Sequence, residues 1–185
     1  MRYFIGFLVT IGLLILLIVL LFNSNNKSNV PSTSKSLVSY ANTNAEVSFM
    51  LDGPTNADQI HERILITVNQ FIVTYQQQQG YDGNVVNQQQ FSNNQNAYTA
   101  FLNALQGAGF TLGKTSAVPN EEQQYCALGN RYVFQLNQGN TQLERYWATS
   151  CMGLHTYNGA VNETVTLFEA QVPNYTTLTT GLKVQ

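Results

Sequence analysis

The stretch FIVTYQQQQGYDGNVVNQQQF, residues 71–91, sets the fold of this 185-residue chain because it has the pattern of two β-strands joined by a tight turn. Residues 71–79 and 84–91 are rich in β-branched, aromatic and amide side chains, and Asp82-Gly83 lies between them. An Asp-Gly pair suits a hairpin turn because both positions tolerate a positive φ angle. The stretch therefore predicts an antiparallel hairpin.

The outer half of this hairpin is unusually polar. With the turn at Asp-Gly, Gln76 pairs with Gln89 and Gln77 with Gln88, so that neither face can be covered by core. We expect this half to project as a two-stranded arm with Tyr81 at its tip. These five residues form a candidate interaction surface, since Tyr and amide side chains make adaptable contacts. The alternative is a solvated hairpin without a partner.

The hairpin is one part of a repeated ββα pattern. After it, helical spacing joins four apolar residues: Tyr98, Phe101, Leu102 and Leu105. A second hairpin is expected from residues 131–137 and 142–151 around a Gly139-Asn140 turn, followed by a helix beginning near Asn162. Two earlier stretches, 47–51 and 64–69, also have strand patterns. The sequence predicts an α+β domain in which tandem ββα units form an antiparallel sheet with helices on one face.

The two cysteines are placed to close the base of the second hairpin. With that turn, Cys151 lies opposite Leu128, and Cys126 is two residues from this point. We expect a disulfide between Cys126 and Cys151; the alternative is two free buried thiols. An even number of cysteines in a small exported domain suggests such a bridge.

The N-terminal segment predicts a membrane anchor. Residues 4–22 contain no charged side chain, and a helix of that length spans about 28 Å, close to the thickness of the hydrocarbon core. We expect a transmembrane anchor at 1–22, a flexible Ser/Asn-rich tether at 23–44 and a single domain at 45–185. One alternative is a cleaved signal peptide. Another is a pilin-like subunit, although Ile11 occupies the position where pilins typically carry glutamate.

Charge and cysteine content indicate on which side of the membrane the domain lies. Residues 45–185 hold five Lys or Arg and ten Asp or Glu, a net charge of −5, which gives little attraction for nucleic acid. Asn and Gln together number 39 of 185 residues, so the surface is expected to be polar and neutral. A disulfide persists in an oxidising compartment. We therefore expect the N-terminus inside, the domain outside the cell membrane, and no nucleic-acid partner.

No motif predicts a catalytic, cofactor or metal site. His61-Glu62 could begin a zinc motif, but Leu65 stands where HExxH requires the second histidine. The run AGFTLGKT at 108–115 resembles a nucleotide-binding loop, but it follows a predicted helix instead of a strand. We expect no cofactor and no metal ion.

Three stretches resemble a known group of proteins: GNRY at 129–132, RYWATSC at 145–151 and LFEAQVPNY at 167–175. They are similar to uncharacterised membrane-anchored proteins of Saccharibacteria-type, reduced-genome bacteria. The resemblance implies an anchored, disulfide-bearing exterior domain. It carries over no functional residue, because no activity is assigned to that group.

Two functions remain open from the sequence. The favoured one is a non-enzymatic module of the cell envelope that binds a protein or glycan partner. The alternative is an envelope-acting enzyme that uses His61, Glu62 or His155 as acid–base groups. A polar cleft that gathers these three residues would favour the enzyme, and scattered positions would favour the binding module.

Overall fold

The computed structural model describes residues 35–184. The expected anchor at 1–22, the membrane segment at 4–22, the pilin-like features and most of the tether lie outside the described residues. Among residues 35–184, no helix combines the length and the apolar character needed to cross a bilayer.

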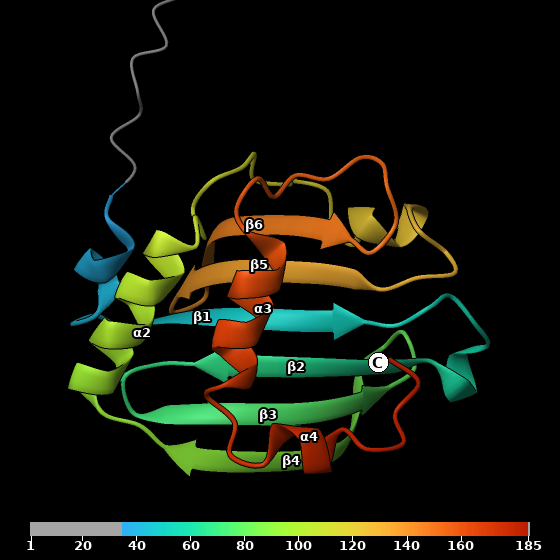
Figure 1. The fold of residues 1–185 in the computed structure, drawn as a ribbon, viewed down its shortest axis with the longest axis horizontal. Coiled ribbons are helices and arrows are strands. Elements are labelled where there is room, and N and C mark those ends of the chain that lie inside the picture. Colours follow the sequence, from blue (N-terminus) through green and yellow to red (C-terminus); the bar gives the residue numbers. More distant parts are fainter. Residues whose placement is uncertain (1–34, 185) are drawn as a thin grey trace, which may run out of the picture. The chain divides into compact units, whose positions relative to one another are not determined.

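The described chain is an α+β domain built on one six-stranded antiparallel sheet (Figure 1). Its strands are β1 (Ala45–Asp52), β2 (Glu62–Val68), β3 (Ile72–Gln79), β4 (Asn84–Ser92), β5 (Arg131–Gln138) and β6 (Thr141–Thr149). Their order across the sheet is β4-β3-β2-β1-β5-β6. The first strand is therefore central, and each following hairpin extends one side of it.

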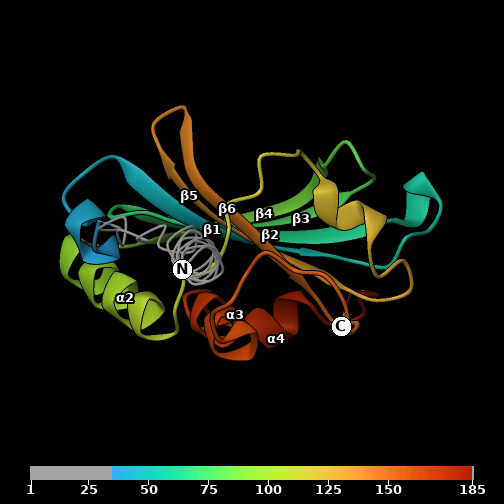
Figure 2. The same ribbon diagram turned by 90° about the horizontal axis from the view of Figure 1, so that it is seen from above.

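Three α-helices cover one face of the sheet (Figure 2). They are α2 (Gln95–Gly107), α3 (Val161–Glu169) and α4 (Tyr175–Leu178). Each of the hairpins β3–β4 and β5–β6 is followed by helix, as the sequence predicts. The Asn94 side chain accepts a hydrogen bond from the backbone N–H of Ala97 and so caps α2.

The core lies between the sheet and these helices because alternate strand residues face the helical layer. Phe49 on β1 lies directly opposite Phe134 on β5, with ring centroids 5.6 Å apart. Phe168 on α3 contacts both Phe49 and Phe101 on α2, at 5.7 and 5.2 Å between ring centroids. These aromatic contacts join both helices to the central strand.

The domain begins before residue 45, which corrects the expected tether boundary. A 3₁₀ turn, η1 (Leu37–Tyr40), packs against α2, and Leu37 is only 1% exposed. The Gln106 side chain accepts hydrogen bonds from Ser36 Oγ at 2.7 Å and from the Leu37 backbone N–H at 3.0 Å. Burial of this apolar turn makes residues 36–44 part of the domain instead of a flexible tether.

The projecting arm predicted at the first hairpin is also wrong. Strand β2 pairs with β3 over its whole length, from Val68 opposite Val73 to Glu62 opposite Gln79. The outer half of the hairpin is therefore part of the sheet. The pairing of β2 with β3 could not be predicted from the hairpin sequence, because the polarity of two strands does not reveal a third strand beside them.

The predicted disulfide is confirmed. Cys126 and Cys151 are bonded, with their Cα atoms 5.6 Å apart. Beside the bridge, the Ser150 backbone N–H donates to the carbonyl oxygen of Asn130 at 2.9 Å. The bridge thus closes the base of the β5–β6 hairpin, where its two strands leave the sheet.

Candidate functional site

A buried charged cluster occupies the end of β1 and the start of β2. Asp52 Oδ1 is hydrogen-bonded to His61 Nε2 at 2.7 Å. Asp52 Oδ2 accepts a hydrogen bond from Arg131 Nε at 2.7 Å. His61 Nδ1 lies 3.2 Å from the carbonyl oxygen of Pro54. The side chains of Asp52, His61 and Arg131 all have zero exposure. Both nitrogens of His61 are therefore occupied inside the protein, which assigns it a structural role.

The β3–β4 turn folds back over this cluster. Tyr81 stacks on His61 and, through its hydroxyl, donates to the carbonyl oxygen of Asn56 at 3.0 Å. Its backbone N–H donates to Asp58 Oδ1 at 2.8 Å. Tyr81 is consequently half-buried against residues 56–61 and is not the free tip of an arm.

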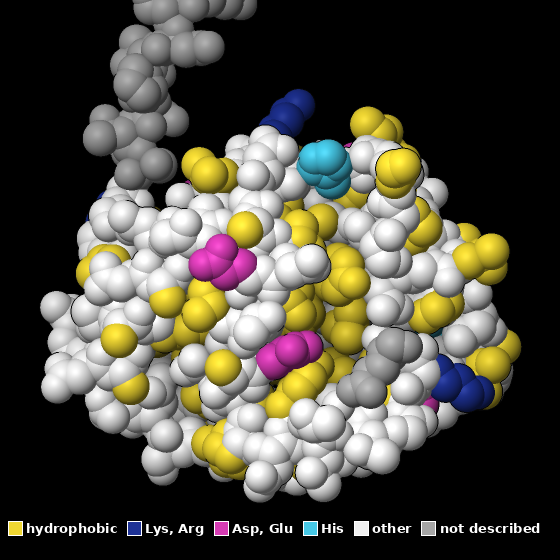
Figure 3. Space-filling model, viewed as in Figure 1, with side chains coloured by type: hydrophobic (Ala, Val, Ile, Leu, Met, Phe, Trp, Pro, Cys, Tyr) yellow, Lys and Arg dark blue, Asp and Glu magenta, His cyan; other side chains and the backbone are white. Residues whose placement is uncertain are grey.

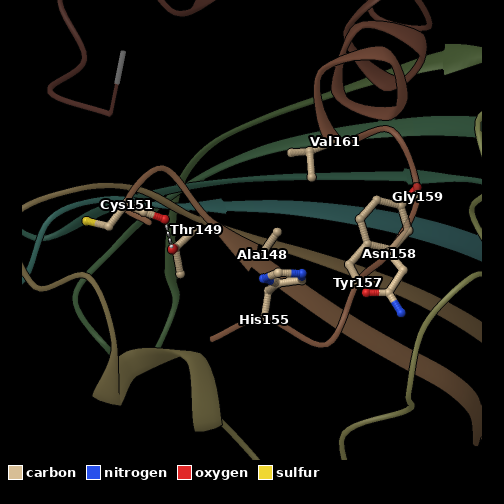
Figure 4. A pocket seen from close by; sticks show the side chains of 8 residues that line it. All are labelled: Ala148, Thr149, Cys151, His155, Tyr157, Asn158, Gly159 and Val161. Atoms are coloured by element: carbon tan, nitrogen blue, oxygen red, sulfur yellow. Dashed lines mark hydrogen bonds between the residues drawn. The ribbon is translucent and has the colours of Figure 1, made fainter. Parts of the chain in front are cut away.

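The other two acid–base candidates lie elsewhere. Glu62 Oε2 accepts a hydrogen bond from the Lys183 backbone N–H at 2.6 Å. His155 is exposed and lines a pocket of about 280 Å³ at the end of β6, beside Cys151 and Tyr157 (Figure 4). The Tyr157 hydroxyl is paired with Thr164 Oγ1 at 2.6 Å. His61, Glu62 and His155 are thus not brought together into one cleft.

The glutamine residues divide between the two faces of the sheet. Gln76 lies opposite Gln88, and its Nε2 donates to Gln88 Oε1 at 2.8 Å. Gln89 instead lies opposite Tyr75, on the face covered by helices. The predicted pairs are therefore wrong by one residue. The turn spans the four residues between Gln79 and Asn84 instead of Asp82-Gly83 alone, which displaces the pairs by two residues, and a β-bulge between Gln77 and Gln78 restores one of the two.

The two edges of the sheet differ in how they are protected. Along β6, the Ser116 N–H donates to the carbonyl of Arg145 at 2.8 Å, and the Thr156 N–H donates to that of Trp147 at 2.9 Å. Neighbouring chain thus covers this edge. At the opposite edge, no strand within residues 35–184 pairs with the outer side of β4.

Strand β4 also lacks the usual safeguards of an exposed edge. Natural edge strands commonly carry charges or proline, which discourage pairing with another chain. The chain has no charged residue between Asp82 and Lys114, and β4 contains no proline. None of the nine β4 residues is buried. Of the features that discourage pairing at a sheet edge, β4 has only the bulge.

The helix-bearing face is similarly poor in charge. Acidic and basic side chains on it are few and separated by neutral surface (Figure 3). An electrostatic recognition site is therefore not evident on this face.

The opposite face of the sheet contains a pocket of about 360 Å³ that the sequence does not predict. Its polar lining residues are Arg63, Ser116, Asn120, Gln135, Gln142 and Arg145. The 3₁₀ turn η3 (Glu121–Gln124) lies on this side of the sheet, away from α2, α3 and α4 (Figure 2). The one available sequence signal was an arginine inside the predicted strand 142–151 and another directly before the predicted strand 64–69, at positions where the alternation points away from the core.

Hydrogen bonds fix the segment beside this pocket. Arg145 Nη2 donates to Glu122 Oε2 at 2.6 Å. Glu121 Oε2 accepts from Ser116 Oγ at 2.7 Å and from Trp147 Nε1 at 3.2 Å. These two hydrogen bonds hold the pKa of the Glu121 carboxyl below its ordinary value. Both acids thus bind groups of the protein, although Glu122 Oε1 is buried without a hydrogen-bond partner among the described residues.

Comparison with protein-family models and with curated proteins finds no match for this chain. Within residues 35–184, no group of three or more His, Cys, Asp and Glu is arranged to hold a metal ion.

Proposed function

We propose that this chain is a membrane-anchored, non-enzymatic binding module of the cell envelope, which displays its domain on the outer side of the membrane. Residues 4–22 would form the membrane span, with the N-terminus inside. Two features support this location: the apolar segment itself and the disulfide between Cys126 and Cys151, a bond that persists in oxidising compartments.

The open edge of β4 carries the proposal of binding. Its outward backbone N–H and C=O groups can form a ladder with an extended segment of another chain, a mode known as β-strand addition. The contrast with β6, whose edge is covered by residues 116 and 156, makes β4 the available side of the sheet. The partner we propose is an extended segment of another envelope protein.

The chemistry of β4 fits a neutral partner segment. Gln88 and Gln90 are exposed, and Val85 and Val86 are 48% and 53% exposed at its beginning. Main-chain pairing would supply affinity, while amide and small apolar side chains would select a segment without strong charge. A glycan partner would not use the backbone edge in this way.

The enzyme alternative receives less support. His61 is buried with both nitrogens occupied, Glu62 binds the backbone N–H of Lys183, and His155 lines a pocket to which neither His61 nor Glu62 contributes. General acid–base catalysis needs positioned groups within reach of one substrate, and these three do not share a site.

Site-directed photo-cross-linking tests the proposal. A photoreactive residue replacing Val86 should trap an envelope protein in intact cells, whereas the same residue replacing exposed Gln124 on η3 should not. The double variant Gln88→Lys/Gln90→Lys places charges on the edge and should abolish the adduct. The matched Gln88→Ser/Gln90→Ser variant should retain it.

Unchanged cross-linking in the lysine variant, with folding verified by its melting temperature, would contradict pairing at β4. An adduct made only with a second copy of this chain would replace the proposed partner by self-association.

A further inference from the structure

The pocket on the helix-free face holds two arginines that are almost completely buried. Arg63 on β2 is 6% exposed and Arg145 on β6 is 5% exposed. Arginine is seldom buried unless it is paired, because desolvating a charge is costly. Both side chains line the same pocket, together with the amides of Asn120, Gln135 and Gln142.

The buried charges of the described domain do not balance. The buried acids are two, Asp52 and Glu122, whereas the buried arginines are three, Arg63, Arg131 and Arg145. Arg131 pairs with Asp52, and Arg145 pairs with Glu122. Within residues 35–184, Arg63 has no carboxylate oxygen within ion-pair distance, and its Nη2 donates instead to the carbonyl of Gly80 at 2.6 Å. One buried positive charge is therefore left without a counter-charge.

Both pocket arginines also retain unused donors. Arg63 Nε and Arg145 Nη1 are buried and have no hydrogen-bond partner among the described residues. Buried donors in folded proteins almost always have partners, so each unpaired one calls for an explanation. The carboxylate that pairs with Arg145 also has a buried oxygen without a partner, Glu122 Oε1, so the Arg145 donor is matched by an acceptor of the protein. On Arg63, the unpaired donor and the uncompensated charge together point to a ligand that accepts hydrogen bonds and carries negative charge.

We propose that this pocket binds a small organic carboxylate. A carboxylate supplies a single negative charge, which matches the one uncompensated arginine, whereas a phosphate group near neutral pH carries more charge. Its planar oxygens suit guanidinium donors. The amides of Asn120, Gln135 and Gln142 can bind hydroxyl or amide groups on the remainder of the ligand, and Met50 provides an apolar contact.

The volume of the pocket limits the size of the ligand. At about 360 Å³ it lies near the lower end of the range for small-molecule sites, roughly 300–1,000 Å³. It therefore suits an acidic monosaccharide or an N-acylated amino acid. Both share a carboxylate beside hydroxyl or amide groups, and this shared chemistry defines the proposed site.

The chain contains a reporter beside the pocket. Trp147 is its only tryptophan, lies two residues from Arg145 on β6 and stacks on Tyr125 at 5.0 Å between ring centroids. Its Nε1 donates to Glu121, which also holds the pocket residue Ser116. Ligand binding that shifts this segment should alter the emission of Trp147.

The test titrates the full-length chain in detergent and records Trp147 emission and melting temperature. The probes are N-acetyl-alanine, glucuronate and inorganic phosphate, with N-acetyl-alanine amide and glucose as their uncharged counterparts. At least one carboxylate should bind, its uncharged counterpart at least tenfold more weakly, and binding should fall with salt. Preference for N-acetyl-alanine or for glucuronate distinguishes a peptide source from a sugar source.

Variants locate the binding. Arg63→Gln should weaken carboxylate binding about tenfold or more, because it removes the uncompensated charge and the Nε donor. Lys114→Gln also removes one positive charge but does not line the pocket, and it should change affinity by less than about twofold. Ala117→Phe fills the exposed rim without altering any charge and should abolish binding, which keeps the test decisive if Arg63→Gln fails to fold.

Three results would overturn the proposal. One is the absence of binding by either carboxylate at millimolar concentration. Another is a phosphate affinity above that of both carboxylates. The third is equal carboxylate affinity in the wild type and in folded Arg63→Gln or Ala117→Phe.

Discussion

Tyr81 lies almost parallel to His61, with ring centroids 4.0 Å apart and ring planes inclined by 13°. The stacking places the β3–β4 turn over the ion pair between Asp52 and Arg131, so that a polar loop closes a buried charged cluster. Tyr81, which is predicted from the sequence to lie at the tip of an arm, thus packs over this buried cluster.

This contact predicts a loss of stability when the ring is removed. Tyr81→Ala should lower the free energy of unfolding by about 1–3 kcal/mol, because a half-buried ring and its hydrogen bonds are lost. Tyr81→Phe should cost about 1 kcal/mol, the contribution of the hydroxyl bonded to Asn56. Urea unfolding measures both. Wild-type stability in Tyr81→Ala would show that the turn does not depend on this stacking.

The disulfide should be inaccessible to thiol reagents and should stabilise the domain. Cys126 and Cys151 are separated by 25 residues, and closing such a loop contributes about 3.5 kcal/mol on the chain-entropy model. Both residues should resist alkylation until a reductant is added, and Cys126→Ala/Cys151→Ala should melt at a lower temperature. Rapid labelling of both thiols in native protein would show that the bridge is absent in solution.

Core and sheet-surface positions should differ sharply in their tolerance of substitution. Phe101 is 4% exposed and contacts Phe168, so Phe101→Ala should cost about 3–5 kcal/mol. Replacement of the exposed β4 residues Gln88 and Gln90 by Ser should cost within about 0.5 kcal/mol for each position. Denaturant titration compares the two variants. Equal destabilisation would mean that the glutamines are packed as tightly as the core.

The change in stability of the domain at acidic pH should depend on the protonation of Glu121. Hydrogen bonds from Ser116 and Trp147 lower the pKa of this carboxyl in the folded state. Its stabilising contribution is therefore present above the unfolded-state pKa of about 4.3, and it is lost as the pH falls through the lower folded-state pKa. Trp147 emission should change with a midpoint below about 4.3 in the wild type.

Ser116→Ala should move this midpoint to higher pH, because it removes the larger of the two hydrogen-bond contributions. Glu163→Gln alters an exposed acid on α3 and should leave the midpoint unchanged. A midpoint that is the same in all three proteins would assign the transition to another group.

The proposed topology predicts that the domain is accessible from outside the cell. Protease added to intact cells or protoplasts should degrade residues 45–185 and leave the apolar segment at 4–22 in the membrane fraction. An antibody against the domain follows the loss on a blot. Protection that disappears only after lysis would place the domain on the inner side.

Local patterns were sufficient to predict the hairpins, the helices and the disulfide. The turn at Gly139-Asn140 joins Gln138 to Thr141 as expected, and Asn94 caps α2. These features depend on residues close in sequence, whose conformational preferences are visible in the chain itself.

Contacts between distant segments could not be predicted in the same way. The pairing of β2 with β3 made the arm part of the sheet, and a four-residue turn together with a bulge placed Gln76 opposite Gln88. The arginine pocket requires β2 and β6 to contribute to one surface, although residues 63 and 145 are separated by most of the domain. Neither bulges nor strand order leaves a local signature in one sequence.

The central position of β1 has a consequence for how the chain reaches its native state. Its Phe49 pairs on one side with Ile66 and on the other with Phe134, so one neighbour is synthesised soon after it and the other much later. Until β5 arrives, the apolar edge of β1 is open to pairing with other chains, and such long-range pairing is slow. In the export that the proposed location requires, the emerging N-terminal half would therefore need protection from such pairing, and the Cys126–Cys151 bond would be among the last to form.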